Sequence, residues 1–168
     1  QGLWFVNNAL RGVGFRDRVR VVAAGKIVTG FHLFRAVALG ADLCNSARPM
    51  MFALGCIQAR QCNTNTCPVG VATQNPAQTV GLVPADKGPR VARYQAATVK
   101  AFLEMVAAAG LEDPCDIRPF HVDRRVAGPD VQSFAKLYPW IPDGFLMDES
   151  VIPKDWRQAW TAANADHF

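Results

Sequence analysis

The fold is decided by residues 19–25, which read VRVVAAG. A short β-branched run that ends at a glycine is typical of a buried strand followed by a tight turn. Beyond this run, Thr29 is placed to cap a helix whose apolar positions recur at helical spacing from Leu33 to Ala38. Gly40 stands where such a helix needs a left-handed terminator. The sequence therefore predicts a strand, a loop and a helix in succession.

A second strand and a second helix follow. Residues 41–44 are too few for a helix and predict a strand, while Pro49 suits the first turn of a helix. We expect this helix to run to about Ile57 and to be buried, because it is apolar nearly all round. Strand, helix, strand and helix with short connections indicate parallel strands in an α/β fold. Two strands cannot form a stable parallel sheet alone, so we expect partner strands outside this sequence.

Composition limits the class of protein. The chain has 168 residues, of which 50% are hydrophobic and 19% charged, a balance that excludes a disordered, collagen-like or coiled-coil chain. No apolar run approaches the roughly 18 residues of a membrane span, and residues 2–20 lack the pattern of a secretory signal. Because the first residue is Gln1, we expect the chain to be part of a longer protein.

Charge is divided unevenly along the chain. Residues 1–95 carry 11 basic and 3 acidic side chains, a balance of +8, and residues 96–168 carry 7 and 11, a balance of −4. The basic residues are scattered and have no interleaved aromatic residues, so nucleic acid is not an expected partner.

The second half of the chain predicts less regular structure. Residues 61–88 are rich in Asn, Thr, Pro and Gly and predict a loop. Residues 94–109 predict an amphipathic helix that ends at Gly110. The remainder is rich in Pro and Trp, and we expect Trp140, Trp156 and Trp160 to pin this tail to a larger body.

Cysteines carry the most specific chemical signal. The motif Cys56-x5-Cys62-x4-Cys67 is followed directly by a proline, in a chain with no export signal. Thiolates at such spacing suit an iron–sulfur cluster. Inert free thiols, a disulfide and a zinc site are the alternatives, although zinc prefers closer pairs and a fourth ligand. We expect Cys44 and Cys115, outside the motif, to be small buried hydrophobic residues.

Residues 55–74, GCIQARQCNTNTCPVGVATQ, resemble the cluster segment of the FMN-binding glutamate synthases. The resemblance implies that Cys56, Cys62 and Cys67 hold a 3Fe-4S cluster. It also implies that the chain is the C-terminal portion of a (β/α)8 TIM barrel, with the last two βα units followed by a cluster-binding loop and a helical tail. The implied divisions are residues 1–54, 55–90 and 91–168.

Two loops fall where parallel-strand folds bind ligands, at the carboxyl ends of the predicted strands. A glycine loop and a helix that begins near Arg48 favour a phosphate there. In the resembling barrels these loops hold the FMN phosphate, which implies contacts from the following residues: Gly25, Lys26, Ser46, Ala47 and Arg48. The chain departs from the family pattern with Ala23-Ala24 where Asp-Gly is frequent and with Ala47 where Gly is frequent. A helix running unbroken from Arg48 to Cys56 would place flavin and cluster roughly 12 Å apart.

The resemblance implies an oxidoreductase of glutamate biosynthesis in the cytoplasm. Such an enzyme aminates 2-oxoglutarate with ammonia, free or derived from glutamine, and reduces the product to glutamate. Its electrons come from a donor such as ferredoxin or an NAD(P)H-dependent subunit and pass through the cluster to FMN. No catalytic residue can be named, because the oxo-acid site would lie on earlier strands upstream of Gln1. The alternatives are a flavin barrel with another amino-transfer substrate and a non-catalytic iron–sulfur electron-transfer fragment.

Overall fold

A parallel pair of short strands organises the first half of the chain. The computed structural model describes residues 2–164 and 166. Strand β1 (Val22–Ala24) pairs in parallel with β2 (Leu43–Asn45), in the register that sets Ala23 beside Cys44, and α2 (Gly30–Ala38) connects the two. The predicted order of strand, helix, strand and helix and the α/β class are confirmed, although both strands are shorter than expected.

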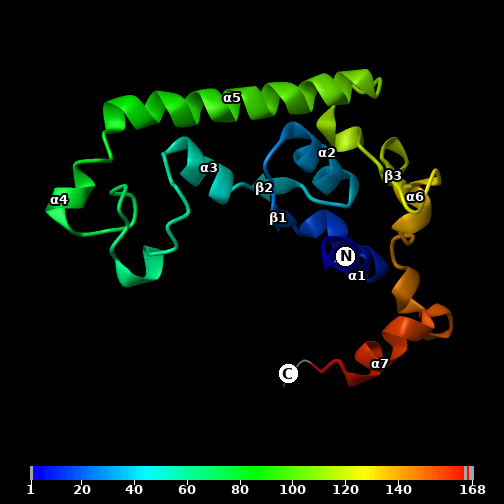
Figure 1. Ribbon diagram of the computed structural model, residues 1–168. Coiled ribbons are helices and arrows are strands. Elements are labelled where there is room, and N and C mark those ends of the chain that lie inside the picture. Colours follow the sequence, from blue (N-terminus) through cyan, green and yellow to red (C-terminus); the bar gives the residue numbers. More distant parts are fainter. Residues whose placement is uncertain (1, 165, 167–168) are drawn as a thin grey trace.

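The other elements surround this unit (Figure 1). A helix precedes it, and a long helix, α5 (Pro84–Ala108), runs along one side against α2 and α3 (Arg48–Ala53). A small antiparallel hairpin and short helices form the tail. In chain order these elements are α1 (Gly2–Gly12), α3 (Arg48–Ala53), α4 (Pro76–Thr79), α5 (Pro84–Ala108), β3 (Asp123–Arg125), β4 (Val131–Ser133), α6 (Phe134–Leu137) and α7 (Lys154–Ala162). Single 3₁₀ turns are η1 (Arg16–Arg18), η2 (Cys62–Thr64), η3 (Pro114–Asp116), η4 (Pro119–His121), η5 (Phe145–Met147) and η6 (Glu149–Val151).

Helix α2 begins and ends as the sequence predicts. The hydroxyl of Thr29 accepts from the backbone N–H of His32, and Nδ1 of His32 accepts in return from the backbone N–H of Thr29. These two bonds satisfy donors that a helix start otherwise leaves open. Gly40 has φ 104° after the helix, and a Cβ at this position would overlap the side-chain amide of Asn7. Glycine is required there for both reasons.

Helix α3 is shorter and less buried than predicted. It ends at Ala53 instead of about Ile57, because Gly55 turns the chain with φ 103°. Pro49 lies in the first turn as expected and is the one buried residue of the helix, whereas Phe52 is exposed. The prediction of a buried helix is therefore wrong, and so is that of one unbroken spacer from Arg48 to Cys56.

Helix α5 begins ten residues earlier than predicted. Pro84 occupies its first turn, where a missing N–H costs little, and Pro89 lies within the helix. Its end before Gly110, which has φ 73°, agrees with the prediction. The predicted loop at residues 61–88 thus contains η2, α4 and the first turn of α5.

One face of the parallel pair is packed and the other is open. Ala23 packs with Ile27 and α2, and a second apolar cluster joins Phe34 of α2 to α5 and the tail. On the opposite face, the paired residues Val22 and Leu43 are 48% and 60% exposed. Since parallel sheets are normally covered on both faces, this half of the chain presents an unfinished layer.

The tail returns to helix α1. The indole N–H of Trp4 donates to the carbonyl of Pro139 (2.8 Å), and the ring of Trp156 packs on Phe5 with centroids 4.5 Å apart. The guanidinium of Arg11 lies 5.2 Å from the centre of the Trp140 ring. The expectation that Trp140 and Trp156 pin the tail agrees with these contacts. No helix among residues 2–164 and 166 has the length and hydropathy needed to cross a membrane.

Candidate functional site

The loops after the two parallel strands lie side by side. Because β1 and β2 are parallel and in register, Gly25 and Ser46 both follow the carboxyl ends of their strands, on the same side of the sheet. The hydroxyl of Ser46 donates to the carbonyl of Ile27 (2.7 Å) and ties one loop to the other. The structure thus brings the two segments that hold the predicted phosphate contacts together.

Most residues of these loops face solvent, and Ile27 is the buried exception. Gly25, Lys26, Ala47 and Arg48 are exposed, and Ser46 is half-buried. Lys26 has φ 57°, a left-handed conformation that is uncommon for a residue with a side chain and is concentrated at functional sites. Helix α3 is only six residues long, so its macrodipole contributes less than the sequence suggested.

Helix α5 adds residues to this edge that the sequence reasoning missed. The phenol of Tyr94 donates to the carbonyl of Val28, which fixes α5 against the first loop. Arg90, one turn earlier, and Arg93, directly before Tyr94, line a shallow cavity of about 380 Å³ with Tyr94 and Pro49. The two arginines are three residues apart, a spacing that puts them on one face of a helix. Because the predicted helix begins at residue 94, the prediction assigns them to the segment before it.

The three cysteines of the motif occupy different environments. Cys56 follows α3 and is half-buried, Cys62 begins η2 and is exposed, and Cys67 is 7% exposed. Within residues 2–164 and 166, no three His, Cys, Asp or Glu side chains are close enough together to hold a metal ion. The structure therefore does not gather the three thiols into one ligand set.

Cys67 lies in a cradle of backbone amides. Hydrogen bonds from the backbone N–H groups of Ala72 and Val69 lower the pKa of its thiol, and those of Val71 and Gly70 add to the effect against a smaller opposing effect of burial. The turn that brings these N–H groups near the sulfur is closed by Gly70, whose N–H donates to the backbone carbonyl of Cys67 (3.2 Å). The Sγ of Cys56 accepts one backbone N–H, from Gln58 at 3.4 Å. The donor chemistry at Cys67 thus suits a thiolate ligand.

Strained backbone is concentrated between Cys56 and Cys67. Non-glycine residues with positive φ in the described part of the chain are Lys26 of the first loop and Gln58, Arg60 and Asn65 between the motif cysteines. Positively charged residues of α5 lie beside the start of this segment, since Lys87 Nζ is 3.9 Å from where a Cβ of Gly55 would stand. The side chain of Lys87 also hydrogen bonds to Asp86 and lowers the pKa of that carboxyl.

The two remaining cysteines differ from each other. Burial raises the pKa of the half-buried Cys44 thiol, in agreement with an inert packing role. Cys115 is exposed, and its expected burial is wrong because η3 leaves its side chain at the surface. A hydrogen bond and the negative charge of Asp113 raise the pKa of the Cys115 thiol.

Comparisons with known proteins identify relatives of this chain. Residues 1–112 match the family model described as a conserved region in glutamate synthase. The glutamate synthase large subunit-like protein YerD of Bacillus subtilis is 40% identical over 117 residues, 70% of this chain and 22% of that protein. The archaeal glutamate synthase [NADPH] of Methanocaldococcus jannaschii is 36% identical over 106 residues, 63% of this chain and 21% of that protein.

Longer relatives match over a shorter stretch of the chain. The chloroplastic ferredoxin-dependent glutamate synthase 2 of Arabidopsis thaliana is 44% identical over 73 residues, 44% of this chain and 4% of that protein. The chain spans about a fifth of the length of the first two relatives. With two thirds of its residues inside the family model, the chain belongs to the glutamate synthase family.

Proposed function

We propose that this chain is part of a glutamate synthase-type oxidoreductase that aminates 2-oxoglutarate reductively to glutamate. The match of residues 1–112 to the family region supports the proposal, together with the pairing of the two strand-end loops through Ser46. Relatives named for NADPH and for ferredoxin suggest an electron donor of one of these two classes. Ammonia would enter free or from glutamine.

The two adjacent loops are proposed to bind the phosphate of FMN. Lys26 and Arg48 would supply charge, and the backbone of Gly25 and Ala47 with the hydroxyl of Ser46 would supply donors. Exposure of the loop side chains and the nearby cationic face of α5 support this role. Bound FMN would supply the hydride that reduces the imine.

Cys56, Cys62 and Cys67 are proposed to hold a 3Fe-4S cluster. The amide cradle at Cys67 supports one thiolate ligand, and the cationic side chain of Lys87 beside Gly55 would favour an anionic group there. Because the three thiols are not gathered, the exposed turn at Cys62 would have to close toward Cys67 when iron binds. Metal sites of this kind commonly order the segment that carries them.

The remainder of a (β/α)8 barrel, upstream of Gln1, is proposed to cover the open sheet face. Val22 and Leu43 lie side by side on that face and are both exposed, as the inner wall of an incomplete barrel would be. Strand residues of a barrel interior pack in layers with residues of the other strands, which would remove this apolar surface from water.

The proposal rests mainly on the match to the family region, which contains the cysteine motif. Because that region implies a flavin and an iron–sulfur cluster, the experiment measures both cofactors. The purified protein should show flavin absorbance bands over a broad iron–sulfur shoulder and should contain iron and acid-labile sulfide. Cys67→Ser should remove nearly all of the iron while flavin stays bound. Cys115→Ser, an exposed cysteine outside the motif, is the matched control and should retain both.

Two results would overturn these assignments. A protein that contains flavin and no iron would contradict the cluster ligands but leave the phosphate loops standing. An iron–sulfur shoulder without flavin would contradict the loop assignment and favour an electron-transfer role.

A further inference from the structure

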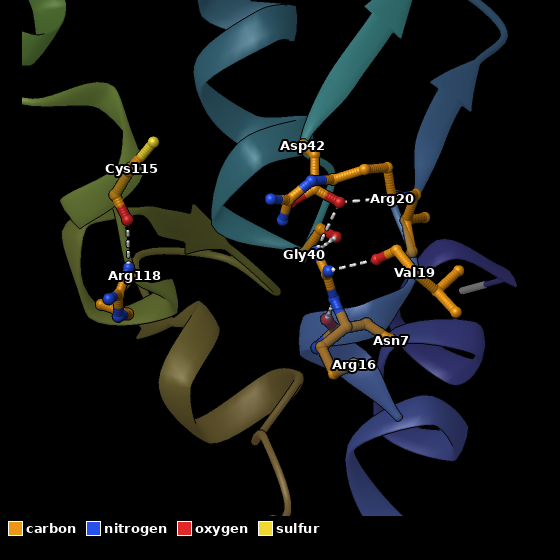
Figure 2. A network of polar contacts seen from close by, with 9 residues as sticks. Asn7, Arg16, Val19, Arg20, Gly40, Asp42, Cys115 and Arg118 are labelled. Atoms are coloured by element: carbon orange, nitrogen blue, oxygen red, sulfur yellow. Dashed lines mark hydrogen bonds and ion pairs between the residues drawn. The ribbon is translucent and has the colours of Figure 1, made fainter. Parts of the chain in front are cut away.

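A cavity of about 670 Å³ lies at the amino ends of the two parallel strands, opposite the two strand-end loops. Its wall includes Asp42 and Leu43, at the start of β2, and Asn7 of α1. The tail closes it with Arg118 and Trp140. Figure 2 shows Arg118 and Cys115 on one side and Asn7, Arg16, Gly40 and Asp42 on the other. This cavity is separate from the proposed FMN and cluster residues.

Part of the polar wall is already occupied by internal contacts. The guanidinium of Arg16 donates to Asn7 Oδ1 (2.8 Å) and to Asp42 Oδ2 (2.9 Å), and it also reaches the carbonyls of Val19 and Gly40 (both 3.0 Å). Burial opposes ionisation of Asp42, but hydrogen bonds from Val21 N–H and Arg16 and the charges of Arg16 and Arg20 lower its pKa overall. Asp42 is therefore an anion that Arg16 neutralises.

Two buried donors of the wall have no acceptor. Asn7 is 1% exposed, and its Nδ2 makes no hydrogen bond in the described part of the chain. The indole Nε1 of Trp140 is likewise buried and unpartnered there. A buried donor without an acceptor destabilises the folded protein, because it has lost its hydrogen bonds to water. Both groups can only donate, so the missing partner is an acceptor atom.

Positive charge surrounds these donors. The cavity wall holds four arginines, at positions 11, 16, 20 and 118, against two aspartates, at positions 17 and 42. The guanidinium of Arg118 is held by the carbonyls of Cys115 and Ile117, and it lies 5.8 Å from the centre of the Trp140 ring. Arg16 pairs with Asp42, which Arg20 also approaches (3.8 Å), and Arg11 pairs with Asp143 of the tail (3.1 Å). Once these two pairs are set aside, Arg20 and Arg118 remain against Asp17, and the net charge of the wall favours an anion.

Apolar side chains form the rest of the wall. Leu33 and Val37 of α2, Phe102 of α5 and Ile117 of the tail all line the cavity. The volume of about 670 Å³ is about twenty times the roughly 30 Å³ that one water molecule occupies in the liquid. A ligand that satisfies the whole wall therefore combines acceptor oxygens with an apolar body.

We propose that this cavity is a binding site for a small organic carboxylate with an apolar body. The carboxylate would accept from Asn7 Nδ2 and Trp140 Nε1, and its charge would be balanced by Arg20 and Arg118. The body would lie against Phe102 and Ile117. The site does not depend on the proposed FMN or cluster binding.

Phenylacetate is the probe for the test, with phenylacetamide as its neutral isostere and inorganic phosphate as a compact anion. In purified protein labelled with ¹⁵N at the indoles, phenylacetate should shift the Trp140 N–H resonance saturably. Calorimetry should show weakening of about fivefold in Arg20→Gln and about tenfold in Trp140→Phe. Arg20 is 73% exposed and Phe retains the aromatic ring, so both variants should fold, which a thermal melt checks.

Matched controls lie close by. Arg18→Gln changes an exposed arginine that does not line the cavity, and Trp156→Phe changes an indole outside it. Both should bind phenylacetate within about twofold of the parent protein. Absence of saturable binding, or equal weakening in Arg18→Gln and Arg20→Gln, would overturn the site. Equal affinity for phenylacetamide would overturn the anion preference, and equal affinity for phosphate would overturn the apolar body.

Discussion

The strand-end loops and the cysteine segment differ in what holds them. Residues 25–28 and 45–48 are fixed by the parallel register, by Ser46 bonded to Ile27 and by Tyr94 bonded to Val28. Residues 56–67 follow the end of α3, carry three strained residues and leave their thiols apart. In Figure 1 the loops lie beside the sheet, whereas the cysteine segment extends away from it. Internal hydrogen bonds hold the first region, whereas under the proposed function a bound cluster would complete the second.

We expect the largest effect from a substitution that disrupts the packing of α2 against α1, which supports the strand-end loops. Gly40→Ala adds a Cβ that overlaps the Asn7 amide at φ 104°. We expect the free energy of unfolding to fall by about 3 kcal/mol, because overpacking and a left-handed alanine add. Gly128→Ala, also at positive φ but with no atom within 4 Å of the new Cβ, should cost about 1 kcal/mol. Urea denaturation measures both, and equal costs would contradict the packing argument.

The next largest effect concerns the ion pair between Arg16 and Asp42, directly before β2. Asp42→Asn removes the charge that Arg16 requires, and we expect a loss of about 2 kcal/mol. The pKa of Asp42 is lowered in the folded protein, so its contribution is complete above the pKa of the unfolded chain and is lost as pH falls through the folded value. The difference in unfolding free energy between parent and variant should therefore shrink below about pH 4. A difference independent of pH between 3 and 7 would contradict the ionised pair.

A smaller effect tests the tie between the two loops. Ser46→Ala removes the 2.7 Å bond to Ile27, which should cost about 1 kcal/mol and weaken FMN binding about fivefold. Fluorescence titration of the apoprotein with FMN measures the affinity. Ser150→Ala is the control for a hydroxyl on the distant tail and should leave FMN affinity unchanged. If both variants bind FMN equally well, Ser46 does not organise the loops.

Local signals in the sequence predicted much of the scaffold. Thr29 and Gly40 mark the bounds of α2, and Pro49 marks the start of α3, because caps and terminators act within one turn. The end of α3 was missed because the backbone of Gly55 overrides an apolar run. The start of α5 was missed because Pro84 and Pro89 are residues typical of loops, whereas here one lies in the first turn of the helix and the other within it.

Long-range features of the site were harder to predict. The adjacency of the two loops followed from the parallel strands, but the approach of Arg90 and Arg93 depends on how α5 packs across α3. The amide cradle at Cys67 depends on a local turn that the spacing of the cysteines does not encode. The open cavity next to Asn7 depends on the return of the tail, more than 100 residues later in the chain.

Hydrogen exchange of the iron-free and iron-loaded protein tests most directly whether a metal completes the cysteine segment. We predict that reconstitution with iron and sulfide protects the amides of residues 57–66 and leaves those of residues 25–28 and 45–48 unchanged. Stoichiometric iron uptake without new protection at residues 57–66, or protection gained equally in the loops, would contradict the account.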